Sequence, residues 1–297
     1  MAKPKQGNIQ GERRNWTTSS LAYLERAKQV MADLSDYWPL TLRQIYYQLV
    51  GALVIENNIG EYKKLSDTLA DARIDGLIEW EAMEDRSRTL LDSTGWTDKT
   101  IFTEAHLENF LSGYNRDLLQ SQDCAIEAWV EKDALAHIIH GVAAPYCVSV
   151  IVAKGFSSVT FKDQCRNRIV ANARAGRRTL ILYFGDLDPS GWSMLPAMMK
   201  TLQEHMRLKD VVSAERCALL PEQVFEYSLP RSIDAMKEKD SRTPKYRAML
   251  REAGYPDDLA VELDALPPRT LENLVRDSIE RNLDLVRFRA GKGNRRH

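Results

Sequence analysis

The feature that most constrains this fold is an alternation of strand-like and helical segments that begins near residue 124. Apolar runs with strand character occupy residues 125–131, 149–152 and 179–185. Segments with helical periodicity fall at residues 133–140, 158–173 and 190–206. Strands that alternate with helices at this spacing are typical of a mostly parallel sheet covered by helices on both faces. The pattern therefore predicts an α/β fold for this part of the chain.

The first hundred residues have a different pattern, with apolar residues at helical spacing. Three helices are expected, over residues 18–34, 41–53 and 61–75, with Thr41 at the start of the second and Gly76 after the third. A short apolar run at residues 77–80 is expected to form a strand, and residues 85–88 would turn it back.

Three helices and a hairpin of this size predict a winged helix-turn-helix domain. Its third helix would present Lys63, Lys64 and Arg73 to a DNA duplex. Helical trios of this kind also occur in proteins that do not bind DNA.

Three carboxylates are expected at one edge of the sheet. Glu131 ends the first strand, and Asp186 and Asp188 follow the third. Ligands of open α/β sheets collect outside the carboxyl ends of the strands. Carboxylates this close repel one another unless a hard cation bridges them, and Mg²⁺, or Mn²⁺, suits a site that handles phosphate. The alternative is that Asp188 only caps the next helix and Asp186 lies in a solvated turn.

The second helix carries two adjacent tyrosines. Its apolar stripe predicts that Tyr46 lies in the core and that Tyr47 is exposed, one turn from Arg43. An exposed phenol beside a guanidinium can act on phosphate, because the cation favours phenolate and can bind a phosphoryl oxygen. Exposed tyrosines beside arginine are also common without any catalytic role.

Several of these segments together resemble a known family. Trp-Val-Glu-Lys-Asp-Ala at residues 129–134, Ala-Lys-Gly-Phe at 153–156 and Gly-Asp-Leu-Asp-Pro-Ser-Gly at 185–191 resemble the Toprim domain of topoisomerases, primases and some nucleases. The version is most similar to the A subunit of topoisomerase VI and to the meiotic double-strand-break protein. Residues 41–47, Thr-Leu-Arg-Gln-Ile-Tyr-Tyr, resemble the motif that carries the nucleophile in that family. The compact, stand-alone Mini-A relatives are the most similar in size.

The resemblance implies roles for particular residues. Glu131, Asp186 and Asp188 would be the metal ligands, and Lys154 with Gly155 would lie beside the scissile strand. The second tyrosine of the motif attacks in the family, which makes Tyr47 the expected nucleophile here. The family works as a homodimer in which the tyrosine of one subunit meets the metal of the other, so active sites shared between subunits are expected.

The composition of the chain limits which partners and which cell compartment are expected. Hydrophobic residues make up 44%, charged residues 28%, and the net charge is −1. No apolar run is long enough to cross a bilayer, so no membrane contact and a cytoplasmic, nucleoid-associated location are expected. Nothing resembles a Walker A loop, so no ATP site is expected in this chain, and ATP-driven strand passage would need a partner ATPase.

The predicted organisation has four parts. They are a basic N-terminal arm at residues 1–18, a winged-helix domain at 19–115, a Rossmann-like Toprim domain with extra C-terminal helices at 116–285, and a basic tail at 286–297. The basic ends would lie on DNA phosphates or serve only as solubilising tails. Asp240, Glu262 and Asp264 would add a second metal site, or act as ordinary helix caps and solvated residues.

The predicted function is metal-dependent cleavage of double-stranded DNA through a tyrosyl-DNA intermediate, with Tyr47 and Arg43 as the catalytic pair. Two alternatives remain open. The first is a Toprim nuclease that uses metal-activated water, with Tyr47 as a bystander. The second is a non-catalytic DNA-binding subunit.

Overall fold

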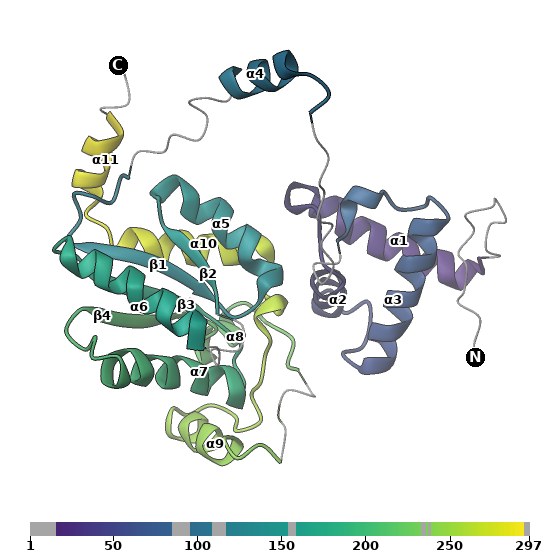
Figure 1. Cartoon of the computed structure of the whole chain (residues 1–297). Coiled ribbons are helices and arrows are strands. Elements are labelled where there is room, and N and C mark those ends of the chain that lie inside the picture. Colours follow the sequence, from purple (N-terminus) through teal and green to yellow (C-terminus); the bar gives the residue numbers. More distant parts are fainter. Residues whose placement is uncertain are drawn as a thin grey trace.

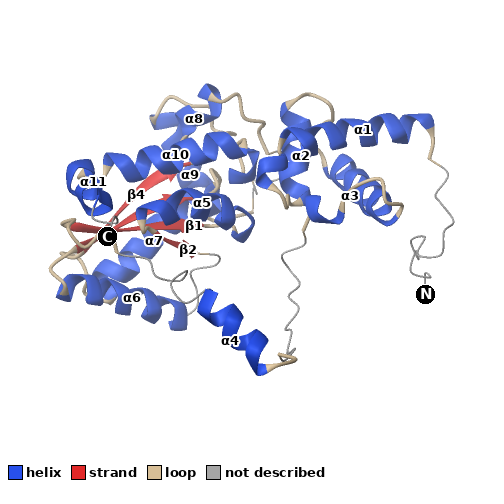
Figure 2. Cartoon of the chain, turned by 90° about the horizontal axis from the view of Figure 1, so that it is seen from above, coloured by secondary structure: helices blue, strands red, loops and turns tan. Residues whose placement is uncertain are grey.

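The computed structural model describes residues 16–84, 96–108, 117–153, 159–232, 236 and 239–293. A group of N-terminal helices packs beside a larger α/β unit, and helix α4 stands apart from both (Figures 1 and 2). The predicted parallel sheet is confirmed. Within the described ranges, no helix is long and apolar enough to cross a membrane.

The sheet has four parallel strands in the order β2-β1-β3-β4. The strands are β1 (Cys124–Val130), β2 (Ser149–Val152), β3 (Arg178–Phe184) and β4 (Val212–Ala218). The first three lie within a residue of the predicted runs. Sequence analysis missed β4, because Glu215 and Arg216 interrupt its apolar pattern.

Helices cover both faces of the sheet. Since side chains alternate along a strand, Trp129 of β1 points to one face while Ala128 and Val130 point to the other. The first face packs against α6 (Val159–Arg174) and α7 (Pro189–Lys200) through Cys165, Ile169 and Met198. The second face packs against α5 (Ala136–Ala143) and α10 (Pro268–Arg281).

The segment before α10 returns to the carboxyl edge of the sheet. Leu187 and Val261 exchange two backbone hydrogen bonds of 2.9 Å each. This antiparallel bridge places residues 262–265, which include the 3₁₀ turn Leu263–Ala265, next to the loop after β3. Three further helices complete this unit: α8 (Pro221–Glu226), α9 (Thr243–Glu252) and α11 (Leu285–Gly293).

The three predicted N-terminal helices are confirmed as α1 (Thr18–Asp33), α2 (Leu42–Gly51) and α3 (Ile59–Ile74). Their starts follow from side-chain caps. Thr17 and Asn58 cap α1 and α3, and Thr41 forms a reciprocal capping box with Gln44 at the start of α2. Gly76, with φ of +70°, follows α3 in the left-handed region that glycine adopts without strain.

The predicted strand at residues 77–80 is wrong. The chain instead forms a 3₁₀ turn at Trp80–Ala82, and Met83 then makes an isolated parallel bridge with Leu40. The expected turn at residues 85–88 lies outside the described residues, so the wing of a winged helix is not tested. Helix α4 (Lys99–Glu108) was not predicted.

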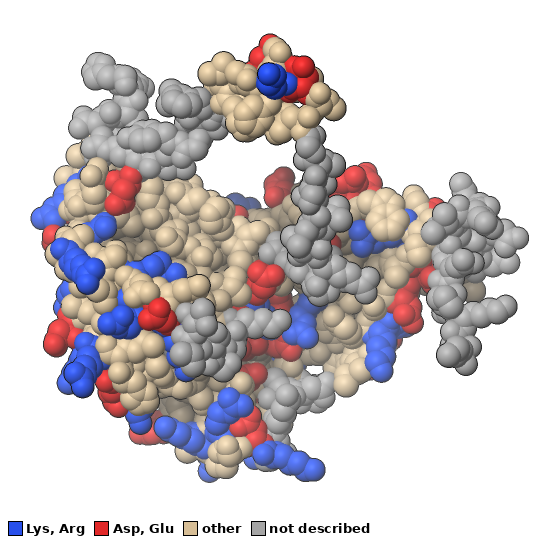
Figure 3. Space-filling model, viewed as in Figure 1, with Lys and Arg blue, Asp and Glu red and all other residues tan. Residues whose placement is uncertain are grey.

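The predicted tail at residues 286–297 is helical in its described part, as α11. Arg287 is not a free arm residue, because it forms ion pairs with Asp123 at 3.1 Å and Asp284 at 3.2 Å. Acidic and basic side chains share most of the face in Figure 3, in agreement with the near-neutral net charge.

Candidate functional site

Glu131 reaches the loop after β3 from the end of β1. Its amide donates to the Phe184 carbonyl at 2.9 Å, which extends the strand pairing by one residue. Its Oε2 accepts hydrogen bonds from the Asp186 amide at 3.1 Å and the Tyr183 hydroxyl at 3.3 Å. Glu131 therefore turns toward the Asp186 segment, as the sequence predicts.

The two aspartates differ in their surroundings. Asp188 caps α7, since its Oδ1 accepts from the Gly191 amide at 2.6 Å, so the capping interpretation is confirmed for that oxygen. Asp186 is only 8% exposed, and its Oδ1 accepts from the Leu263 amide at 2.7 Å. The alternative of a solvated turn is therefore wrong for Asp186.

We call the carboxylates of Glu131, Asp186 and Asp188 together the acidic edge. Each of them has one oxygen that makes no hydrogen bond or ion pair with the described residues. These oxygens are Glu131 Oε1, Asp186 Oδ2 and Asp188 Oδ2, and none is a fully buried orphan atom. Carboxylate oxygens of this kind are the ligands that Mg²⁺ and Mn²⁺ prefer. As the side chains stand, no group of three His, Cys, Asp or Glu residues in the described ranges meets the geometry for a metal. The donor set fits a hard cation, and the side chains would have to close around it.

Gly191 allows the close approach of the two loops. A Cβ at this position would lie 2.5 Å from the Asp186 carbonyl oxygen and 3.0 Å from Glu131 Oε2. Any side chain there would push the Asp186 backbone or the Glu131 carboxylate away. The glycine of the Asp-Pro-Ser-Gly sequence at residues 188–191 is thus required by packing.

Burial and neighbouring negative charge raise the pKa values of Glu131 and Asp186. Burial raises the pKa of Glu131, and the charge of Asp188 raises it further against the lowering effect of the Asp186 amide. Burial raises the pKa of Asp186 to about 7, although the ammonium of Lys132 acts in the opposite direction. Carboxylates in this condition bind a proton or a cation more readily than isolated ones do.

Arg216 supports the loop that carries Asp186. This role was not predicted from the sequence. Its Nη1 donates to the carbonyls of Gly185 and Asp186 at 3.2 Å, and its Nη2 donates to the Gly191 carbonyl at 2.5 Å. The guanidinium lies over the rings of Tyr183 and Trp192. A single cation therefore fixes the backbone on both sides of Asp186.

Lys132 forms ion pairs with three carboxylates. The sequence did not predict it as a functional residue either. Its Nζ lies 3.1 Å from Asp186 Oδ1 and 2.8 Å from both Glu262 Oε2 and Asp264 Oδ2. An ammonium has three donors, so all are used. Burial would lower the pKa of Lys132, but the three carboxylates raise it, and the side chain stays charged.

We call Lys132, Asp186, Glu262, Asp264 and Arg43 the Lys132 cluster. Arg43 completes it from α2, with Nη1 2.5 Å from Glu262 Oε2 and 4.0 Å from Asp264 Oδ2. The oxygens that would have made a second metal site are thus bound to side-chain cations, although Asp264 Oδ1 is buried with no hydrogen-bond partner in the described part of the chain.

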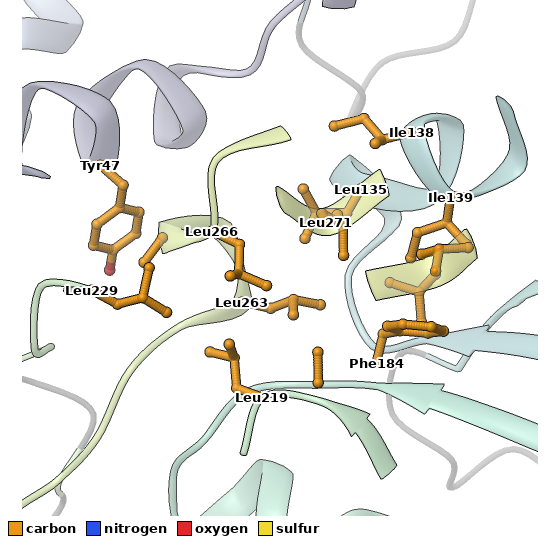
Figure 4. Close-up of a cluster of buried hydrophobic side chains, with 14 of the residues drawn as sticks. Tyr47, Leu135, Ile138, Ile139, Phe184, Leu219, Leu229, Leu263, Leu266 and Leu271 are labelled. Carbon is orange, nitrogen blue, oxygen red and sulfur yellow. The ribbon is translucent and has the colours of Figure 1, made fainter. Parts of the chain in front are cut away.

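Tyr47 is buried, so the prediction of an exposed tyrosine is wrong. It is 5% exposed, and Figure 4 shows its ring among buried side chains near Leu229 and Leu266. Helical periodicity identified only the stripe that faces the other N-terminal helices. The second surface that covers α2 comes from residues more than 180 positions later in the chain, including Leu229.

The Tyr47 hydroxyl lies close to the Lys132 cluster. Glu262 and Ser232 lie beside it and shift its pKa in opposite directions. Burial raises the pKa of Tyr47, and the negative charge of Glu262 raises it further, while Lys132 and Arg43 lower it. The prediction for Tyr46 is confirmed, because it is 4% exposed and donates to Asn57 Oδ1 at 3.0 Å.

The residues expected to contact DNA differ in their exposure and in their partners. Lys63 and Lys64 are exposed on α3, and Lys64 pairs with Glu61 at 3.2 Å. Arg73 instead binds its own chain, where it donates to the carbonyls of Trp80 at 3.0 Å and Met83 at 2.9 Å. Lys154 and Gly155 lie outside the described residues.

Comparisons with known proteins found no similar protein. No protein-family model matches the chain, and no curated protein and no solved structure is significantly similar to it.

Proposed function

We propose that this chain is a metal-dependent enzyme that cleaves double-stranded DNA, with the winged-helix and Toprim architecture of a topoisomerase VI A subunit of the Mini-A type. The observation that carries the proposal is the acidic edge, where Glu131, Asp186 and Asp188 each keep one oxygen free for a cation. The order of the motifs supports the assignment, since the tyrosine motif precedes the acidic segments by a domain-sized interval.

In the proposed reaction, the Tyr47 oxygen attacks the phosphorus of a DNA phosphodiester. The phenol loses its proton to solvent, a bond forms between its oxygen and phosphorus, and the bond to the 3′ oxygen breaks. The departing oxygen takes up a proton from solvent to become a 3′ hydroxyl, and the enzyme becomes linked to the 5′ end. Mg²⁺ or Mn²⁺, held by the acidic edge, would stabilise the charge on the phosphoryl group and on the departing oxygen. Arg43 pairs with Glu262 close to Tyr47, and its positive charge favours the phenolate. A homodimer would cut both strands.

The test is incubation of supercoiled plasmid with the protein and Mg²⁺ or Mn²⁺. We expect linear product with protein attached to its 5′ ends. Tyr47→Phe should abolish both products, whereas Tyr46→Phe, which removes a neighbouring phenol bonded to Asn57, should retain them. Glu131→Gln should also abolish cleavage while leaving a mobility shift with the plasmid.

A second candidate function is a nuclease of the same fold in which metal-activated water attacks the phosphate. The burial of Tyr47 favours it, because a phenol that is 5% exposed must move before it reaches a substrate. A Tyr47→Phe protein that still linearises plasmid, with no protein-linked DNA, would support this candidate and remove the first. A mobility shift without cleavage under any metal would favour a non-catalytic DNA-binding subunit.

A further inference from the structure

The outer side of α6 concentrates positive charge in a chain that is otherwise acidic. Residues 159–178 contain six basic residues and one acidic residue, so this stretch carries +5 and the rest of the chain carries −6, given the net charge of −1. Basic side chains gather over the α6 side of the α/β unit, at the left of Figure 3.

Two arginines on this surface are free to bind an external anion. Arg166 and Arg174 are exposed, and neither forms an ion pair with any residue that the structure describes. Two other arginines of the stretch serve the fold, since Arg168 pairs with Glu127 at 3.0 Å and Arg177 with Asp117 at 3.5 Å. The free arginines are therefore distinct from the structural ones.

The spacing of these arginines suits an extended anion rather than a small one. Arg166 and Arg174 are separated by eight residues of helix, or about 12 Å along its axis, and differ by about 80° around it. The whole helix is about 24 Å long, which matches roughly seven base pairs of duplex.

The surface also begins beside the acidic edge. The Ala153 amide, just after β2, donates to the Val130 carbonyl at 2.8 Å, so the chain leaves β2 at the edge that carries Glu131. Helix α6 then runs from that edge toward the opposite end of the sheet, where Arg178 begins β3.

We propose that the outer side of α6, with Arg166 and Arg174, binds the phosphate backbone of duplex DNA. This inference rests on the proposed function for the choice of DNA, and it adds a contact surface outside the acidic edge and the N-terminal helices. Binding through guanidinium and phosphate groups is independent of base sequence and depends strongly on salt.

The experiment measures the affinity for a fluorescent duplex by anisotropy, in EDTA and over a series of salt concentrations. The variant Arg166→Gln/Arg174→Gln keeps a polar side chain at both positions and removes two positive charges. The matched control is Lys245→Gln/Arg269→Gln, which removes two exposed charges that have no ion pair among the described residues, from α9 and α10. Each lost phosphate contact lowers the slope of log K against log salt by about 0.9, so we expect the α6 variant to lose about 1.8 and the control nothing.

Equal slopes for the α6 variant and the control would overturn the proposal. A wild-type protein that does not bind duplex, or that binds anionic vesicles through the same arginines but duplex without them, would overturn it too. Because no divalent metal is present, the result is separate from cleavage. A protein that binds DNA through α6 but leaves plasmid intact with Mg²⁺ would refute the proposed enzyme and retain this surface.

Discussion

At the scale of single residues, Lys132 is the side chain on which most of the candidate site depends. Its ammonium is bound to three carboxylates from two places in the chain: Asp186 after β3, and Glu262 and Asp264 before α10. Buried ion pairs contribute little net stability relative to apolar residues, but removal of one partner leaves uncompensated charge. Lys132 therefore holds together a group of acids that would otherwise repel one another.

Replacement of Lys132 by Met should strongly destabilise the protein. The side chain keeps its length but leaves three crowded carboxylates without a counter-charge, and we expect a loss of about 3–5 kcal/mol in the free energy of unfolding. Denaturant unfolding monitored by circular dichroism at neutral pH measures this loss. Lys132→Arg is the control that retains charge. A loss below about 1 kcal/mol for Lys132→Met would show that the acids relax apart or take up protons at little cost.

Glu262 should make the stability depend on pH in the acid range. Burial would raise the pKa of Glu262, but Lys132, Arg43 and the Tyr47 hydroxyl together outweigh this effect, and the pKa is lowered. A lowered folded-state pKa means that the ionised carboxylate adds stability above about pH 4.3, the unfolded value, and that this contribution is lost as pH falls through the folded value.

We expect the difference in unfolding free energy between wild type and Glu262→Gln to be constant near neutral pH and to shrink as pH falls below about 4. Unfolding curves collected between about pH 3 and pH 7 test this expectation. Glu252→Gln, on the exposed end of α9, is the control and should show no such trend. A difference that grows with acidity would contradict the assignment.

At the scale of elements, the start of α7 shows how a loop places the carboxylates of the acidic edge. Asp188 caps the helix, Gly191 removes the side chain that would strike the Asp186 carbonyl, and Arg216 holds the carbonyls on both sides. A cap, a glycine and an arginine together set the direction in which Asp186 and Glu131 face each other. The loop is therefore a rigid support for the acidic edge.

Gly191→Ala should destabilise the protein by about 1–3 kcal/mol, the usual cost of an added methyl group that does not fit. The physical reason is the 2.5 Å approach of the new Cβ to the Asp186 carbonyl oxygen. Gly141→Ala in α5 is a matched control, because nothing lies within 4 Å of its Cβ, and it should be neutral or stabilising. Thermal unfolding of both variants is the measurement, and equal melting temperatures would refute the packing argument.

At the scale of the whole molecule, α2 joins the N-terminal helices to the α/β unit. Arg43 pairs with Glu262, Tyr37 donates to Glu272 at 2.9 Å, and Tyr47 packs against Leu266. These contacts enclose Tyr47 within its own chain. Attack on DNA at either its own acidic edge or that of a second subunit would first require the helix to move.

Loss of the Arg43 charge should loosen this contact and expose Tyr47. We expect Arg43→Gln to increase the rate at which Tyr47 is nitrated by tetranitromethane, measured by mass spectrometry of the peptide that contains it. Tyr46, whose hydroxyl is bonded to Asn57 within the N-terminal helices, is the internal control. An unchanged rate at Tyr47 would mean that apolar packing alone holds α2 in place.

The sequence by itself determined the local structure and the donor set of the site. Caps at Thr17, Thr41 and Asn58 and the periods of the apolar residues are written in short windows, so helices and three of the strands were predictable. Three carboxylates at one edge followed from strand order, because parallel strands end together.

Only the tertiary structure decided the environment of Tyr47 and the role of Lys132. The partners of Lys132 lie 54, 130 and 132 positions away in the chain, and the contact between Arg43 and Glu262 spans 219. Periodicity shows that a helix has a buried face, but it cannot show a second surface that arrives from a remote segment. The burial of Tyr47 and the pairing of Glu262 and Asp264 with cations therefore depended on long-range packing, which no short window of sequence encodes.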